Sequence, residues 1–97
     1  MPVAWVQNWS EGGADTSNYD AITERLGVRD NPPEGLIFHA AGATEDGGFR
    51  VFDVWESREH LERFLNERLM PAVQAVAGPD APRPTNEMYE LHAIMQP

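Results

Sequence analysis

Two ionisable residues of this 97-residue sequence have the types and surroundings for proton-transfer chemistry. His39 stands between Phe38 and Ala40 in one short apolar run, and Asp53 stands in the next. A neutral imidazole in an apolar setting can take a proton from a phenol or an acidic carbon, and its ordinary pKa of about 6.5 suits that task. A carboxylate beside the ring can orient it and stabilise the imidazolium. His39 is therefore a candidate base held by Asp53; the alternative is a core histidine hydrogen-bonded for structure alone.

Aromatic and aliphatic residues near this pair are candidates for contact with a planar ligand. Side chains alternate across a strand, so Asp53 shares a face with Val51 and Trp55, while His39 shares one with Ile37. If the two strands pair with His39 near Asp53, this face is apolar yet carries two ionisable groups, as the lining of a ligand cavity would. The predicted substrate-binding residues are Trp5, Trp9, Ile37, Val51, Trp55 and His92. For the tryptophans, plain packing is the alternative.

The opposite faces of these strands hold only apolar side chains, so we expect those faces to pack against helices. They carry Phe52 and Val54 in one strand, Leu36, Phe38 and Ala40 in the other, and Tyr89, Leu91, Ala93 and Met95 in the last strand. Alternation thus places the His39 face away from the helices, as a cavity wall closed by a second subunit. The function hypothesis, in contrast, places the substrate in a pocket between the sheet and the helices.

Alternating strand and helix patterns must position these residues. Strands are expected over residues 3–9, 35–43, 49–55 and 86–96, with helices from Asp15 to Gly27 and from Ser57 through Val76, the second kinked or restarted at Pro71. The order βαββαβ predicts an α+β, ferredoxin-like fold whose four-stranded antiparallel sheet has both helices on one face. Because the other face would stay bare, we expect two copies to pair into a dimeric α/β barrel.

Composition limits the kinds of protein and partner that fit. A chain this short supports one domain over residues 1–97, and its 41% hydrophobic and 24% charged residues are those of an ordinary globular protein. The net charge of −9 disfavours nucleic acid and anionic membranes as partners. The first residues lack a basic segment followed by an apolar one, which predicts a cytoplasmic protein. With no cysteine, disulfides and thiolate chemistry are excluded.

The hairpin and second helix resemble a known family. Phe52 to Ser57 read FDVWES, a strand that ends in V-W-x-S, and the following helix from Arg58 to Val76 contains Phe64 and Leu65. In these residues, and in length and element order, the chain resembles the antibiotic biosynthesis monooxygenase (ABM)-like group of the dimeric α/β barrel superfamily. The resemblance implies a homodimer with its sheets face to face around one pocket per subunit. In some members it implies cofactor-free oxidation of phenolic or quinol-like substrates.

Other members of that group bind and degrade haem, through an Asn on the first strand with a Trp and a His on the second helix. Asn8 matches the Asn, but Phe64 and Gln74 stand where the Trp and the His would fall, and His60 at the exposed start of the helix is a poor substitute. Haem degradation is not expected, and no cofactor is predicted. His39, Asp53 and His92 could hold iron or zinc if they converged, but they show no ligand spacing, so no metal is predicted.

The function hypothesis is a small enzyme of the cofactor-free monooxygenase or cyclase type. It would act on an aromatic or polyketide-like molecule in a pocket between the sheet and the helices, with His39 as the base. The alternative is a non-catalytic dimeric barrel that binds a hydrophobic small molecule or responds to stress. A third hypothesis is a plain interaction module, which fully packed sheet faces without a cavity would support.

Overall fold

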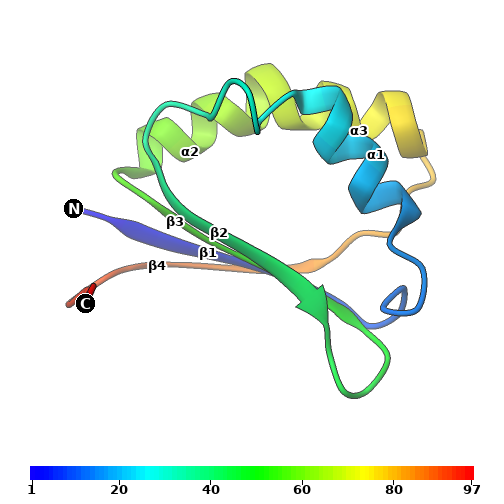
Figure 1. Cartoon of the computed structure of the whole chain (residues 1–97), viewed down its shortest axis with the longest axis horizontal. Coiled ribbons are helices and arrows are strands. Elements are labelled where there is room, and N and C mark those ends of the chain that lie inside the picture. The colour runs from blue at the N-terminus through cyan, green and yellow to red at the C-terminus, as the bar shows by residue number, and fades with distance from the viewer.

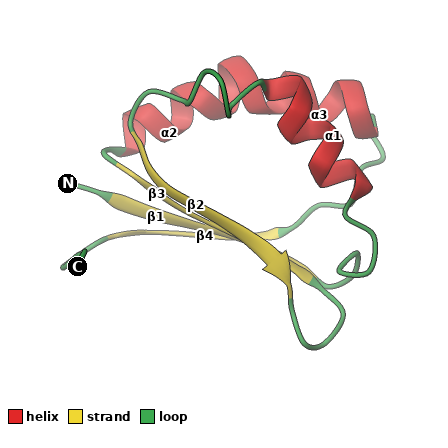
Figure 2. Cartoon of the chain, viewed as in Figure 1, coloured by secondary structure: helices red, strands yellow, loops and turns green.

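A four-stranded antiparallel sheet and a layer of helices over one of its faces make up the fold. The computed structural model describes residues 1–97, and the strands follow the order β2-β3-β1-β4. All helices lie on the same side of the sheet (Figure 1), and the other side is left open (Figure 2). This is the predicted ferredoxin-like α+β fold. The elements are β1 (Val3–Trp9), α1 (Ser17–Leu26), β2 (Leu36–Ala43), β3 (Phe49–Trp55), α2 (Arg58–Phe64), η1 (Leu65–Leu69), α3 (Met70–Ala77) and β4 (Thr85–Glu90).

Helix α1 lies within the predicted range, but it begins at Ser17, two residues later than expected. An Oδ atom of Asp15 accepts a hydrogen bond from the Ser17 N–H at 3.0 Å, which satisfies one of the free donors of the first turn. Gly27 ends the helix with a φ of 65°, a left-handed conformation that glycine adopts without strain. No helix of the chain is both long and apolar enough to cross a membrane.

The second helical segment is interrupted near Pro71, as its proline predicts. The Ser57 side chain accepts a hydrogen bond from the His60 N–H and so caps α2. A π-helical turn, η1, then separates α2 from α3, which starts at Met70. Pro71 has no N–H to donate to the carbonyl of Glu67, four residues earlier, and the wider turn accommodates that loss.

The core lies between the sheet and α2, and it shows which sheet face meets the helices. Val3, Trp5, Trp55 and Leu61 form its buried centre, and the Trp55 ring lies 5.1 Å from the ring of Phe64. Val51, Asp53 and Trp55 therefore face the helices, and the prediction that Phe52 and Val54 do so is wrong. Because Asp53 is charged, its face of the strand looks the more polar one in the sequence, but the Asp53 carboxylate is paired with His39 and Trp55 inside the protein.

Strand β4 is shorter than predicted. It ends at Glu90, so the expected continuation to Gln96 is wrong, and His92 lies exposed beyond the strand. Met88 sits opposite Trp5 and packs against the core, whereas Tyr89 sits opposite Ala4 on the other face of the sheet. The expected helix side of this strand is thus also inverted.

Candidate functional site

The pairing of β2 with β3 brings His39 directly beside Asp53. The two residues are opposite each other in the antiparallel register, and a β-bulge between Leu36 and Phe38 precedes them. On its other side, Asp53 is opposite Trp5 of β1, whose side chain is in the helix-side core. The face with His39 therefore lies under the helices of its own chain. The expectation that this face points away from the helices and is closed by a second subunit is wrong.

A chain of hydrogen bonds links four side chains at this place. His39 Nδ1 lies 2.5 Å from Asp53 Oδ1, and His39 Nε2 lies 2.6 Å from the hydroxyl of Tyr19 on α1. Asp53 Oδ2 accepts a hydrogen bond from the Trp55 indole N–H at 3.3 Å. Asp53 is only 4% exposed, whereas the His39 side chain is 38% exposed at the sheet edge. A buried carboxylate thus supports a histidine that solvent can reach.

The protons of this chain can be assigned from its partners. Burial raises the pKa of the Tyr19 phenol above its ordinary value of 10.0. Among the smaller influences on this pKa, the carboxylates of Asp53 and Asp20 raise it, while the Thr23 hydroxyl and Arg29 lower it. At neutral pH Tyr19 is therefore a phenol, and its O–H can be donated to His39 Nε2. In that arrangement His39 Nδ1 carries the proton that faces Asp53, and both ring nitrogens are engaged.

Tyr19 is the member of the site that the sequence did not reveal. It falls at the three-and-four spacing of Ile22 and Leu26, which is the signal of an ordinary helix core position. Its ring centroid lies 5.3 Å from that of Phe49, and its ring plane is nearly parallel to that of His39, at an angle of 2°. Only the packing of α1 over the edge of β2 brings its hydroxyl to the histidine.

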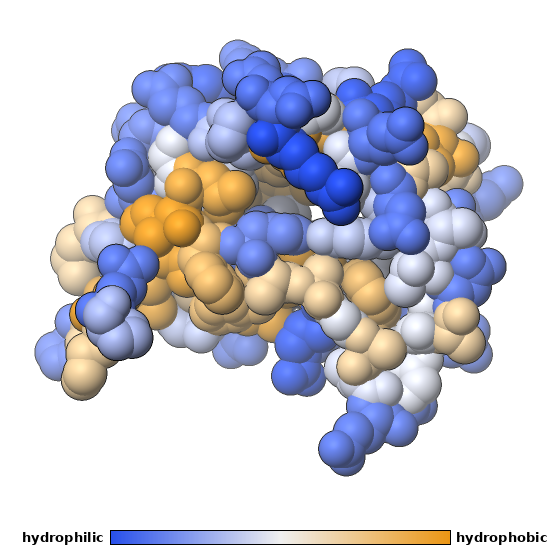
Figure 3. Space-filling view, viewed as in Figure 1, coloured by the Kyte–Doolittle hydropathy of each residue, from blue (hydrophilic) through white to orange (hydrophobic).

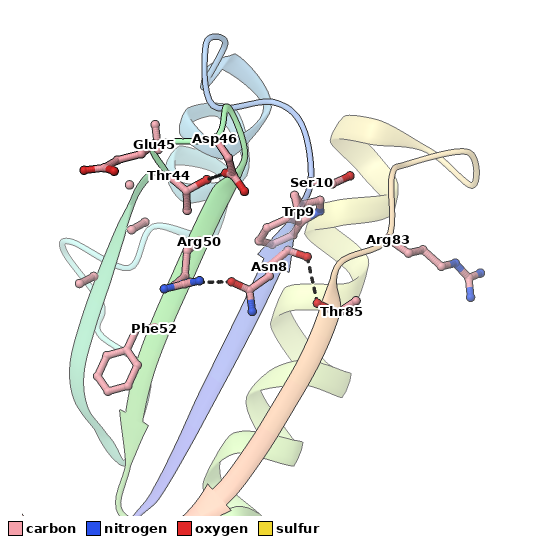
Figure 4. A pocket seen from close by; sticks show the side chains of 14 residues that line it. Asn8, Trp9, Ser10, Thr44, Glu45, Asp46, Arg50, Phe52, Arg83 and Thr85 are labelled. Carbon is pink, nitrogen blue, oxygen red and sulfur yellow. Dashed lines mark hydrogen bonds between the residues drawn. The ribbon is translucent and has the colours of Figure 1, made fainter.

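A broad open groove lies on the sheet face turned away from the helices, near the β2–β3 hairpin. It measures about 940 Å³, and fourteen residues line it. In Figure 4 the guanidinium of Arg50 points toward Asn8, and its Nε donates to Asn8 Oδ1 at 2.6 Å, with Phe52 further along β3. A smaller hollow of about 220 Å³ lies beside Arg68. Neither hollow includes His39, so neither is the predicted pocket between sheet and helices.

The candidate site instead opens at the edge of the sheet. Seen from this side, the surface is hollowed between the helical layer and the sheet, with polar and apolar residues at the rim (Figure 3). Tyr19 and His39 approach each other from these two layers, α1 and β2. The hydrogen-bond chain is therefore exposed to solvent at the β2 edge, through the His39 side chain.

No protein-family profile and no curated protein sequence matches the chain. Solved structures do. SnoaB, a cofactor-independent oxygenase from Streptomyces nogalater, matches at a TM-score of 0.63 and 16% identity over 98% of this chain and 95% of that one. A candidate antibiotic biosynthesis monooxygenase from Deinococcus radiodurans matches at a TM-score of 0.70 and 11% identity, over 99% of this chain and 97% of that one. Another candidate monooxygenase of this kind, from Caulobacter crescentus, matches at a TM-score of 0.66 and 21% identity, over 97% of this chain and 91% of that one. The fold is that of the antibiotic biosynthesis monooxygenase-like proteins.

Within this fold, the predicted substrate-binding residues separate into three groups. Trp5, Val51 and Trp55 are buried on the face that carries His39 and Asp53. Trp9 lies at the far end of β1, where its indole N–H donates to the Pro82 carbonyl.

Two others are placed away from the hydrogen-bond chain. Ile37 lies in the β-bulge and is 37% exposed, and His92 follows the end of β4. His92 does not join His39 and Asp53, and no three His, Asp or Glu side chains of the chain are grouped to hold a metal ion. The metal-binding alternative for these three residues has no support in their placement.

Proposed function

We propose that this chain is an enzyme that removes a proton from a phenolic or enolisable aromatic small molecule, with His39 as the base. The resulting anion either reacts with O₂ without a cofactor or closes a ring by attacking a carbonyl of the same molecule. In the monooxygenase form, an activated aromatic CH₂ group and O₂ give a ketone and water. In the cyclase form, electrons stay within the substrate and O₂ is not consumed.

The hydrogen-bond chain from Tyr19 through His39 to Asp53 carries this proposal. A proton that arrives at Nε2 converts His39 to an imidazolium, while the Nδ1 proton stays on the ring and faces the Asp53 carboxylate at 2.5 Å. The buried negative charge stabilises that cation and fixes the ring orientation. Burying the Asp53 carboxylate carries a desolvation penalty, and a histidine with a purely structural role would not require a buried charge beside it. The fold shared with SnoaB, itself a cofactor-independent oxygenase, supports the same reaction class.

Replacing His39 by glutamine is expected to lower turnover by about 10²- to 10⁴-fold, because the proton acceptor is lost while a polar side chain of similar size remains. Turnover would be measured against naphthols, hydroquinones and bicyclic ketones, by oxygen uptake and by product detection. The control is His60→Gln, since His60 lies at the start of α2 and binds Ser57 instead. Both variants should unfold within a few degrees of the parent protein.

Three outcomes would count against the proposal. Full activity of His39→Gln would exclude His39 as the base. Equal losses of activity and thermal stability in that variant would indicate a structural histidine. Ligand-dependent quenching of tryptophan fluorescence, without turnover of any of these compounds, would favour the non-catalytic binding protein instead.

We further propose that the working form is a homodimer in which the two open sheet faces meet. Phe38 is 51% exposed on this face and makes an edge-on contact with Phe52, with ring centroids 6.2 Å apart. Large apolar side chains on an uncovered sheet face are typical of an interaction surface. The resemblance to the dimeric α/β barrel proteins implies the same pairing.

A further inference from the structure

The hydroxyl of Tyr19 occupies the one ring nitrogen of His39 that is free to act as a base. Nδ1 is engaged by Asp53, and Nε2 lies 2.6 Å from the Tyr19 oxygen. A substrate therefore meets Tyr19 before it meets the imidazole, unless the phenol moves aside. This arrangement raises the question of which side chain takes the proton from the substrate.

We propose that Tyr19 is the catalytic residue that touches the substrate and that it relays the proton to His39. This inference rests on the function proposed above. As the substrate O–H or C–H proton moves to the Tyr19 oxygen, the phenolic proton of Tyr19 moves to His39 Nε2. The products are the substrate anion, a re-formed Tyr19 phenol and a His39 imidazolium paired with Asp53. One proton is lost by the substrate and one is gained by His39, and no electrons are transferred.

The surroundings of Tyr19 hold its hydroxyl in place for this relay. The ring packs against Phe49, at 5.3 Å between centroids. The end of α1 is tied down by Arg68, whose guanidinium donates to the carbonyl oxygens of Leu26 at 2.8 Å and Asn31 at 3.2 Å. A fixed helix and a packed ring keep the phenol within hydrogen-bond distance of the imidazole, which is the geometry that rapid proton transfer requires.

The competing interpretation is that the Tyr19 hydroxyl only occupies the position at His39 Nε2 and that the substrate displaces it. The phenol would then merely fill the position at Nε2 until a substrate hydroxyl or acidic carbon replaces it. Removing the Tyr19 hydroxyl should then leave proton abstraction unchanged or accelerate it, because one competing hydrogen bond disappears. The relay predicts the opposite, since without the hydroxyl no group carries the proton across.

The test compares Tyr19→Phe with Tyr89→Phe in the full chain. Tyr89 is a suitable control because it is the only other tyrosine and lies on the opposite face of the sheet. The probe is 2-tetralone, a bicyclic ketone with an acidic benzylic CH₂ group, and NMR would follow its deuterium exchange in D₂O without oxygen. We expect Tyr19→Phe to lower kcat for exchange by about 10²-fold with KM within about twofold, because the hydroxyl acts in the transition state. Tyr89→Phe should match the parent protein.

A second measurement changes the acidity of the phenol without removing it. In the Tyr89→Phe background Tyr19 is the only tyrosine, so incorporated fluorotyrosine labels this position alone. The relay predicts that the exchange rate and its pH profile change with the acidity of the phenol. A tyrosine that only fills space would leave both unaltered.

The outcomes separate this inference from the proposed function. If Tyr19→Phe exchanges as fast as the parent while His39→Gln does not, the relay is wrong and His39 is the direct base. If His39→Gln also exchanges at the parent rate, the proposed function fails as well. A parent protein that exchanges 2-tetralone no faster than buffer would overturn both.

Discussion

Replacing Asp53 by asparagine is expected to lower the rate of catalysed proton transfer by about 10²- to 10⁴-fold while the fold is retained. Asp53 accepts hydrogen bonds from His39 Nδ1 on one oxygen and from the Trp55 indole on the other. An asparagine has one acceptor oxygen and one NH₂ group, so one of these two donors must face another donor. It also lacks the negative charge that stabilises the His39 imidazolium.

The rate would be measured as deuterium exchange of 2-tetralone, beside an unfolding curve in urea. Asp80→Asn provides the control, because Asp80 is an exposed residue in the loop before β4. The control should keep the parent rate, and Asp53→Asn should still unfold in one cooperative transition. A parent-like exchange rate in Asp53→Asn would show that the carboxylate does not support the base.

Replacing Phe52 by aspartate is expected to convert the proposed dimer to a monomer at micromolar concentration. Phe52 lies on the open sheet face in contact with Phe38. Two copies of that face brought together would bury the new carboxylate against Phe38, and taking a charge out of water costs several kcal/mol. Light scattering coupled to gel filtration would give the mass of both proteins.

Ile94→Asp provides the matched control for this substitution. Ile94 is also exposed and apolar, but it lies beyond the end of β4 and outside the paired strands. This variant should remain a dimer. A monomeric parent protein at micromolar concentration would contradict the dimer, yet it would leave the hydrogen-bond chain intact, because Tyr19, His39 and Asp53 all belong to one chain.

The periodicity of the sequence was sufficient to predict the order of the elements, whereas the register of the hairpin entered the prediction only as a condition. Strand β1 has the expected bounds, and the short 44–48 loop restricts how the two hairpin strands can pair. Because residues opposite each other in a sheet share a face, the hairpin register also brought His39 close to Asp53. The order of the elements depends on short-range spacing, which a single sequence contains, while the exact register required the folded hairpin.

Which face of the sheet meets the helices could not be predicted in the same way. Both faces are rich in apolar residues, since the core covers one and the open face presents Phe38 and Phe52. Polarity misled the assignment at Asp53, because a buried carboxylate is tolerated once His39 and Trp55 pair with it. Alternation defines two sets of side chains but does not say which set lies inside.

The role of Tyr19 and the end of β4 needed the folded chain for different reasons. Tyr19 is distant from His39 in sequence, and a tyrosine at helical spacing carries no sign that its hydroxyl has a specific partner. In β4, the alternation of apolar residues continues beyond Glu90, but pairing with β1 stops where β1 begins, at Val3. The length of the neighbouring strand therefore limits this one.

The most direct test of the proton-relay site is the protonation state of His39, measured by ¹⁵N and ¹H NMR in the parent protein at neutral pH. The proposed relay requires the ring proton on Nδ1, and it predicts a strongly downfield signal for that proton and loss of the signal in Asp53→Asn. It also predicts an unprotonated Nε2 that accepts the Tyr19 O–H, whose ¹⁵N shift changes in Tyr19→Phe. A proton on Nε2, or His39 ring signals that are unchanged in both Asp53→Asn and Tyr19→Phe, would contradict the proposed relay.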